Sequence, residues 1–111
     1  MNPAPIKPTI TADVLEKLDI RVGTVLDVDD VPNSEKLVQL RVSFGDRQRI
    51  ILSAMRQERA NPREIEGKQA LFVVNLKPRK MRGIVSQGML FDLGFADGIL
   101  PVLAILRALF N

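Results

Sequence analysis

Residues 38–52, VQLRVSFGDRQRIIL, decide the fold, because two extended stretches flank a turn signal within them. The first stretch has an apolar residue at every second position, which is the period of a strand with one buried face. These residues are Val38, Leu40, Val42 and Phe44. Gly45-Asp46 suits a two-residue hairpin turn, and Gln48–Leu52 continues as the returning strand. We therefore expect an antiparallel hairpin here.

The segment before this hairpin predicts a first strand and a short helix. Apolar residues alternate with polar ones along the strand, at Ile20, Val22, Leu26 and Val28. Gly23 predicts a bulge or a sharp bend, which a small barrel uses to turn its corners. Asp13 is the expected N-cap of a helical turn or two over Asp13–Leu18, with Glu16 three residues later. Residues 1–10 contain three prolines and should form an extended arm.

After the hairpin, the sequence predicts a short helix and two or three more strands. The helix should start at Asn61-Pro62-Arg63-Glu64, which offers an N-cap, a proline and a carboxylate, and stop at Gly67. The strands are expected at Gln69–Asn75, Val85–Leu93 and Ile99–Ala104. This order, with the short helix between strands three and four, is typical of the OB-fold, a five-stranded Greek-key β-barrel. We thus expect an all-β fold with short helices, divided into an arm over 1–12 and a barrel domain over 13–111.

Composition narrows the range of functions. The 111 residues include no cysteine and no histidine. Thiolate metal sites and disulfides are excluded, and the commonest general base and nitrogen ligand are missing. We therefore expect no catalytic residue, no metal and no cofactor. No run approaches the roughly 18 apolar residues of a membrane span, and residues 1–10 lack the apolar core of a signal peptide, so we expect a cytoplasmic protein.

Positive charge is concentrated in the middle of the chain. Residues 36–82 carry twelve Lys or Arg against four Asp or Glu, whereas residues 1–35 carry three against seven. A basic middle suits a polyanion site, with a merely solubilising surface as the alternative. The densest part is Lys77-Pro78-Arg79-Lys80-Met81-Arg82, which has four cations in six positions. Pro78 and Gly83 predict a loop that could meet phosphate oxygens, with a solvated turn as the alternative.

Aromatic residues indicate which kind of nucleic acid to expect. Tryptophan and tyrosine are absent, and of the five phenylalanines at least Phe44, Phe72 and Phe91 fall on expected core faces. Sequence-tolerant binding of single strands usually depends on exposed aromatic platforms. A basic barrel without them should instead recognise the backbone and shape of folded RNA.

Five motifs, taken in order, resemble those of a known family, the tRNA-binding domain. They are Leu18-Asp19-Ile20-Arg21-Val22-Gly23, Pro32-Asn33-Ser34-Glu35-Lys36-Leu37, Ile65–Lys68 leading into Val73-Val74-Asn75-Leu76, Lys80-Met81-Arg82-Gly83 and Ser86-Gln87-Gly88-Met89-Leu90. This domain occurs free-standing in bacteria and appended to methionyl-tRNA synthetases. The resemblance implies an OB-fold, a homodimer for free-standing members, and a tRNA ligand recognised by shape.

The resemblance also implies RNA contacts, at Lys36, Asn75, Lys77, Arg79, Lys80, Arg82, Ser86 and Met89. Some of these residues have a simpler interpretation. Asn75 and Ser86 could satisfy backbone groups at strand ends, and Lys36 could merely flank the hairpin. Met89 alternates with Gln87 and Phe91, which favours a core position. The four cations of 77–82 are the best candidates, and an aminoacyl-tRNA synthetase is a candidate partner.

Two other functions compete with RNA binding. A CsaA-like secretion chaperone has the same fold and binds unfolded polypeptide, but Lys80-Met81-Arg82-Gly83 is the tRNA-binding variant of this loop. A metal-dependent enzyme would need clustered carboxylates, and of Asp27, Asp29 and Asp30 only Asp27 and Asp29 share a strand face. The sequence has no nucleophile–base pair, glycine-rich phosphate loop or cofactor motif.

The C-terminal residues bear on the oligomeric state. Ile99–Leu106 is more apolar than a closing strand requires, and hiding that surface in a partner predicts a homodimer. Ile105–Asn111 is also apolar, unlike the polar tail that is usual in the family. The sequence therefore predicts a dimer, and the atypical C-terminal residues leave the details of its interface open.

Overall fold

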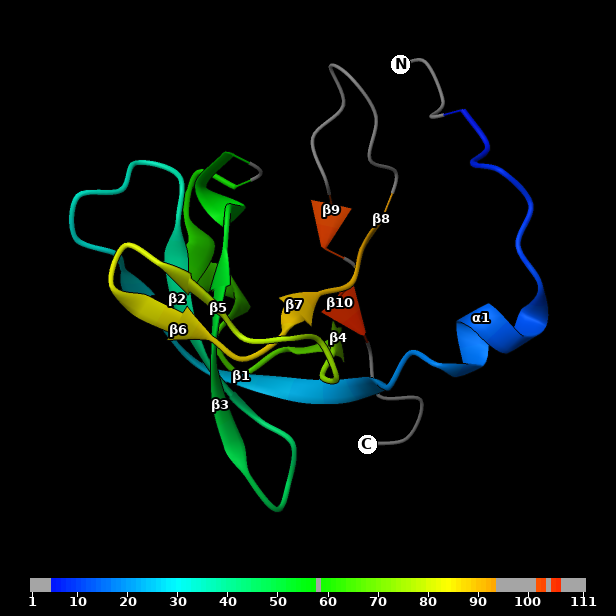
Figure 1. Ribbon diagram of the computed structural model, residues 1–111. Coiled ribbons are helices and arrows are strands. Elements are labelled where there is room, and N and C mark those ends of the chain that lie inside the picture. Colours follow the sequence, from blue (N-terminus) through cyan, green and yellow to red (C-terminus); the bar gives the residue numbers. More distant parts are fainter. Residues whose placement is uncertain (1–4, 58, 94–101, 104, 107–111) are drawn as a thin grey trace.

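The computed structural model describes residues 5–57, 59–93, 102–103 and 105–106. Short helices and strands follow one another along these residues (Figure 1). In chain order they are α1 (Ala12–Glu16), β1 (Ile20–Asp30), β2 (Val38–Ser43), β3 (Gln48–Ser53), the 3₁₀ helices η1 (Met55–Gln57) and η2 (Pro62–Ile65), β4 (Gln69–Val73), β5 (Arg79–Met81), β6 (Ile84–Ser86), β7 (Met89–Leu90), β8 (Asp92–Leu93), β9 (Val102–Leu103) and β10 (Ile105–Leu106).

The main sheet is an antiparallel, nearly closed barrel. Strands β10, β4, β1, β2 and β3 are hydrogen-bonded in that order, and β7 pairs with β4. Gln87, between β6 and β7, links this part of the chain to β3. Its backbone N–H donates to the Ile50 carbonyl at 2.8 Å, and its side-chain Oε1 accepts from the Ile50 N–H at 3.1 Å. The predicted OB-type barrel is confirmed, and Figure 1 shows α1 lying outside it.

The interior is filled by the apolar faces that the sequence marks most clearly. Val38, Leu40 and Val42 are all buried, as the alternation predicts. Phe44 packs on Phe72 in an edge-to-face arrangement with ring centroids 5.7 Å apart. The hairpin turn is also confirmed, because the Phe44 N–H donates to the Arg47 carbonyl at 2.9 Å and Gly45 adopts a φ of 95°.

Strand β1 departs from the expected alternation. Val22 is 49% exposed, whereas Val25 and Val28 are buried at 1% each. The register with β2 shifts between Val25 and Asp27, so Leu26 is the extra residue of a bulge that changes the face of every later side chain. The bulge is therefore not at Gly23, which serves close packing. A Cβ there would lie 2.5 Å from Val42 Cγ1 and 2.9 Å from the Phe72 ring.

The two predicted helices are present but differ in detail. Helix α1 covers Ala12–Glu16, and its N-cap is Thr11, two residues before the predicted Asp13. Asp13 lies in the first turn, where its negative charge interacts favourably with the helix dipole. The second helix, η2, follows Asn61 as predicted and is a single 3₁₀ turn. Gly67 ends it with a φ of 82°.

The predicted fifth strand, Val85–Leu93, is interrupted. It is divided into β6, β7 and β8. The break between β6 and β7 lies at Gln87, whose backbone N–H bonds to Ile50 of β3. Gly88 allows this close approach, since a Cβ there would lie 3.0 Å from the Val73 carbonyl.

The described part of the predicted last strand, Ile99–Ala104, is β9, which pairs with β8. Ile105 and Leu106 follow as β10 on β4. Residues 99–101 and 104 of that prediction, and residues 107–111, lie outside the described residues. Within the described ranges, no helix has the length and apolar character needed to cross a membrane.

Candidate nucleic-acid interface

The basic segment forms a β-hairpin and not the loop that the sequence predicted. Strands β5 and β6 pair in the register Arg79↔Ser86, Lys80↔Val85 and Met81↔Ile84. Arg82 and Gly83 form the two-residue turn, with φ values of 52° and 81°. Positive φ at both turn positions is the signature of a type I′ turn, which matches the twist of paired strands. Gly83 therefore makes a tight turn between two short strands.

The hairpin distributes its cations over different directions. Neighbouring residues of a strand point to opposite faces, so Arg79 and Lys80 cannot form one flat patch. Arg79 shares its face with Met81, which is half-buried, whereas Lys80 lies opposite Val85, which is 48% exposed. Arg82 stands at the tip. Lys77, Arg79, Lys80 and Arg82 are all exposed.

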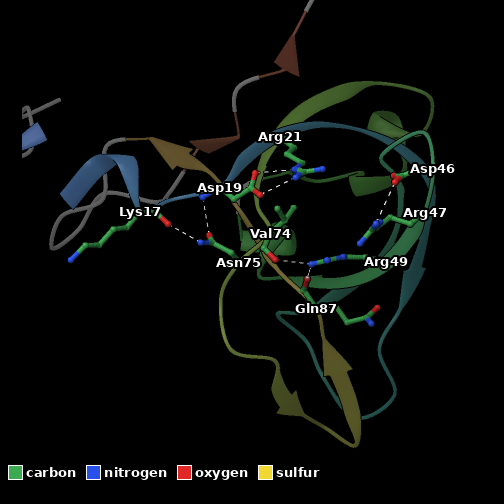
Figure 2. A network of polar contacts seen from close by, with 9 residues as sticks. All are labelled: Lys17, Asp19, Arg21, Asp46, Arg47, Arg49, Val74, Asn75 and Gln87. Carbon is green, nitrogen blue, oxygen red and sulfur yellow. Dashed lines mark hydrogen bonds and ion pairs between the residues drawn. The ribbon is translucent and has the colours of Figure 1, made fainter. Parts of the chain in front are cut away.

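The base of the hairpin is held by a set of hydrogen bonds (Figure 2). Arg49 Nη1 donates to the carbonyls of Val74 and Gln87, at 2.7 and 3.1 Å. The Asn75 side chain accepts from the Asp19 N–H at 2.8 Å and donates to the Lys17 carbonyl at 2.7 Å. The end of β4 is thereby fixed to the segment that joins α1 and β1.

Ser86 fixes the returning strand. Its side chain is buried, and its hydroxyl accepts from the Leu52 N–H at 3.0 Å and donates to the Gly88 carbonyl at 3.1 Å. The hydroxyl thus ties β6 to β3. This geometry corresponds to the simpler interpretation of Ser86, in which it satisfies backbone groups.

The two remaining candidates lie away from the hairpin strands. Lys36 is exposed in the connection between β1 and β2. Met89 lies on β7 opposite Val73, and it is 51% exposed. The expectation that Met89 belongs to the core is wrong, because the inward position of this short strand is taken by Leu90, which is buried.

The described arginines fall into two groups, those that have a protein partner and those that have none. Seven arginines form ion pairs with carboxylates or hydrogen bonds with carbonyls: Arg21 with Asp19, Arg41 with Asp27, Arg47 with Asp46, Arg56 with Asp30, Arg59 with Glu64, Arg63 with Asp29 and Glu66, and Arg49 with the two carbonyls above. Arg79 and Arg82 have no such partner among the residues that the structure describes. Among the described arginines, those of the hairpin are therefore the uncompensated ones.

A second arginine cluster, which is not among the predicted RNA contacts, surrounds a hollow of about 200 Å³. Arg21, Arg47 and Arg49 line it together with Asp19. The Arg21 guanidinium donates a hydrogen bond to each Asp19 carboxylate oxygen, at 2.9 and 3.0 Å. These bonds lower the pKa of the Asp19 carboxyl below its usual value. The spacing Asp19-Ile20-Arg21 was the available signal, because residues two apart on a strand share a face.

The acidic residues considered for a metal are paired with arginines. Asp27 accepts from Arg41 Nε at 2.6 Å, Asp30 contacts Arg56, and Asp29 lies 3.9 Å from Arg63. Within the described residues, no three Asp or Glu side chains gather in a way that could hold a metal ion.

The fold is thus an OB barrel that carries an exposed basic hairpin. Residues 20–102 match the model of the family described as "Putative tRNA binding domain". The chain belongs to this family of tRNA-binding domains, which is defined by binding and not by catalysis.

Similar proteins agree with this assignment. The chain is 45% identical over 104 residues to the methionine–tRNA ligase of Phocaeicola vulgatus, covering 93% of this chain and 15% of the ligase. For the ligase of Parabacteroides distasonis the identity is 46% over 99 residues, covering 89% and 14%. The chain therefore spans about one seventh of the length of these relatives.

Solved structures give the same barrel. A MetRS-related protein from Pyrococcus horikoshii superimposes with a TM-score of 0.79 and 35% identity, covering 90% of each chain. The CsaA chaperone of Picrophilus torridus has a TM-score of 0.73 at 22% identity, covering 93% of this chain and 94% of its own. At that identity the chaperone supports the fold alone.

Proposed function

We propose that this domain binds folded tRNA through the cations of the β5–β6 hairpin. One observation carries the proposal: Arg79 and Arg82 lack a protein partner in the described part of the chain, whereas the other described arginines have one. An unpaired guanidinium keeps its full fork of donors for a phosphate and breaks no ion pair on binding. Lys77 and Lys80 add charge beside them.

A folded ligand suits this surface better than a single strand. Phe72 is fully buried, and Phe44 is packed against it, so neither offers an open platform for bases. Binding that depends on phosphates and on the spacing of cations recognises the shape of an RNA helix more than its sequence. The hairpin projects its cations from both faces and from its tip, which suits the curved backbone of a folded RNA.

The remaining candidates take supporting parts in this proposal. Lys36 supplies a further phosphate contact from the β1–β2 connection, and Met89 a nonpolar contact from β7. Asn75 and Ser86 have their polar atoms occupied by backbone partners. They act on RNA mainly by shaping the hairpin that carries the cations.

A homodimer is part of the proposal. Val22 pairs with Leu71 and Met89 pairs with Val73, so these side chains share one face of β1, β4 and β7, on which Val73 is itself buried. Val22 and Met89 are each about half exposed on it. A second copy would cover this apolar face and double the cationic surface. Light scattering that reports a monomer at micromolar concentration would count against it.

The cellular role that we propose is tRNA binding in the cytoplasm, without catalysis by this domain. The ligase relatives support an aminoacyl-tRNA synthetase as the partner to which tRNA is delivered. The rival role, binding of unfolded polypeptide, draws support only from the shared fold of the CsaA structures.

Two measurements test the proposal together. Sequencing the RNA that copurifies with the protein should find tRNA enriched over other RNAs. Binding to tRNA should weaken steeply with salt, because phosphate contacts release counterions. Affinity for an unfolded preprotein that persists in high salt, with no tRNA enrichment, would favour the chaperone role instead.

A further inference from the structure

The basic hairpin leaves the barrel and returns to it at two neighbouring points. It leaves at Val74, directly after β4, and returns at Gln87, directly after β6. One nitrogen, Arg49 Nη1, donates to the carbonyl at each point, at 2.7 Å for Val74 and 3.1 Å for Gln87. Figure 2 shows the Arg49 side chain reaching from β3 to both carbonyls.

The chemistry of this contact suits an arginine. A guanidinium nitrogen carries two hydrogens at a fixed angle, so it can serve two carbonyls at once, and its charge strengthens both bonds. The bond to Val74 is partly buried, which lowers the competition from water there, whereas the bond to Gln87 is exposed. Arg49 therefore holds the two ends of the hairpin segment against β3. We call its two hydrogen bonds, to the Val74 and Gln87 carbonyls, the clasp.

We infer that Arg49 is a positioning residue for RNA binding: it fixes the direction of the β5–β6 hairpin and so of its cations, without touching RNA itself. This inference rests on the proposed tRNA-binding function. It separates Arg49 from Arg47, its neighbour at the same strand end. Among the described residues, the Arg47 side chain pairs with the adjacent Asp46 alone, at 3.3 Å, and it is 58% exposed.

Arg47 provides the matched control. Arg49→Gln and Arg47→Gln each remove one positive charge from the same end of β3. A general electrostatic effect on RNA would weaken binding alike in both variants. The clasp predicts that Arg49→Gln weakens tRNA binding by about tenfold, which corresponds to the low end of the range for a charged hydrogen bond, and Arg47→Gln by much less.

A double-mutant cycle separates positioning from contact. Arg49→Gln is measured in the wild type and in the Arg79→Ala/Arg82→Ala background, with tRNA at several salt concentrations. If Arg49 acts through the hairpin cations, its loss should have little further effect once they are gone. A loss of the same size in both backgrounds, or equal effects of the two glutamine variants, would overturn the inference.

The free protein gives a readout that needs no RNA. Amide NMR shifts of residues 79–86 should change in Arg49→Gln and stay nearly fixed in Arg47→Gln. Unchanged hairpin shifts in Arg49→Gln would refute the clasp even if tRNA binding failed for other reasons. If wild type bound no tRNA while the shifts moved as expected, the proposed function would fail and the clasp would stand as a structural device.

Arg49→Lys guards against loss of the fold. It keeps the charge and one donor group but not the planar fork. If Arg49→Gln cannot be purified folded, the lysine variant enters the same cycle. Its smaller expected loss should again vanish in the Arg79→Ala/Arg82→Ala background, and a loss that persisted there would overturn the inference.

Discussion

Replacing Arg79 and Arg82 together by alanine should weaken tRNA binding and leave the barrel folded. Neither side chain belongs to the buried core, and neither has a described protein partner to lose. Arg82 already holds a positive φ of 52°, so alanine there introduces no new backbone strain. The thermal unfolding midpoint should therefore stay close to that of the wild type.

The magnitude follows from two phosphate contacts. A hydrogen bond to a charged group contributes about 1.5 kcal/mol at the low end of its range, which suits these exposed side chains. Losing two of them should cost about 3 kcal/mol, or roughly a hundredfold in the dissociation constant. The plot of log affinity against log salt should also become shallower by about one to two units.

Filter-binding titrations at several salt concentrations measure both quantities. The matched control is Arg41→Ala/Arg47→Ala, which removes the same charge from arginines that are paired with Asp27 and Asp46. The control should bind tRNA almost as the wild type does. Equal losses in the two double variants would mean that net charge, and not the hairpin, drives binding, and the reasoning would be refuted.

Three further predictions concern the scaffold. Gly23→Ala should lower the free energy of unfolding by about 1–3 kcal/mol in urea titrations, because its Cβ would overlap core side chains; an unchanged midpoint would contradict this packing. Ser86→Ala should destabilise the fold by about 1–3 kcal/mol, since it leaves the buried Leu52 N–H without its acceptor; lost RNA affinity at full stability would instead support a direct contact. The pKa of Asp19 is lowered by its hydrogen bonds to Arg21, so the stability from this pair is present above the usual value of 3.8 and is lost as the pH falls through the lower, folded value. The stability difference between wild type and Asp19→Asn should shrink over that range, and a difference that is constant with pH would contradict the pairing.

Local sequence patterns predicted the strands of the barrel well where the alternation of buried and exposed residues is enough to identify a strand. The β2–β3 hairpin was predictable because Val38, Leu40 and Val42 alternate and Gly45 follows them. Strand β1 was mispredicted in detail because a bulge at Leu26 depends on pairing with β2, which no local pattern contains. The break at Gln87 has the same origin, since its bonds run to β3.

The candidate site was predictable in composition and not in arrangement. The density of cations marked residues 77–82, but the type I′ turn at Arg82-Gly83 makes a hairpin where a loop was expected. The contrast between paired and unpaired arginines is a tertiary property, because partners such as Asp27 and Arg41 lie far apart in sequence. The clasp by Arg49 is tertiary for the same reason.

The most direct test compares wild-type affinity for folded tRNA with affinity for an unstructured RNA of the same length, at one salt concentration. Both RNAs carry the same number of phosphates, so charge alone would favour folded tRNA only through its higher charge density, by less than about tenfold for four contacts. Folded tRNA should bind at least about tenfold more tightly, because the hairpin matches a fixed arrangement of phosphates. Equal affinities, or tighter binding of the unstructured RNA, would contradict it.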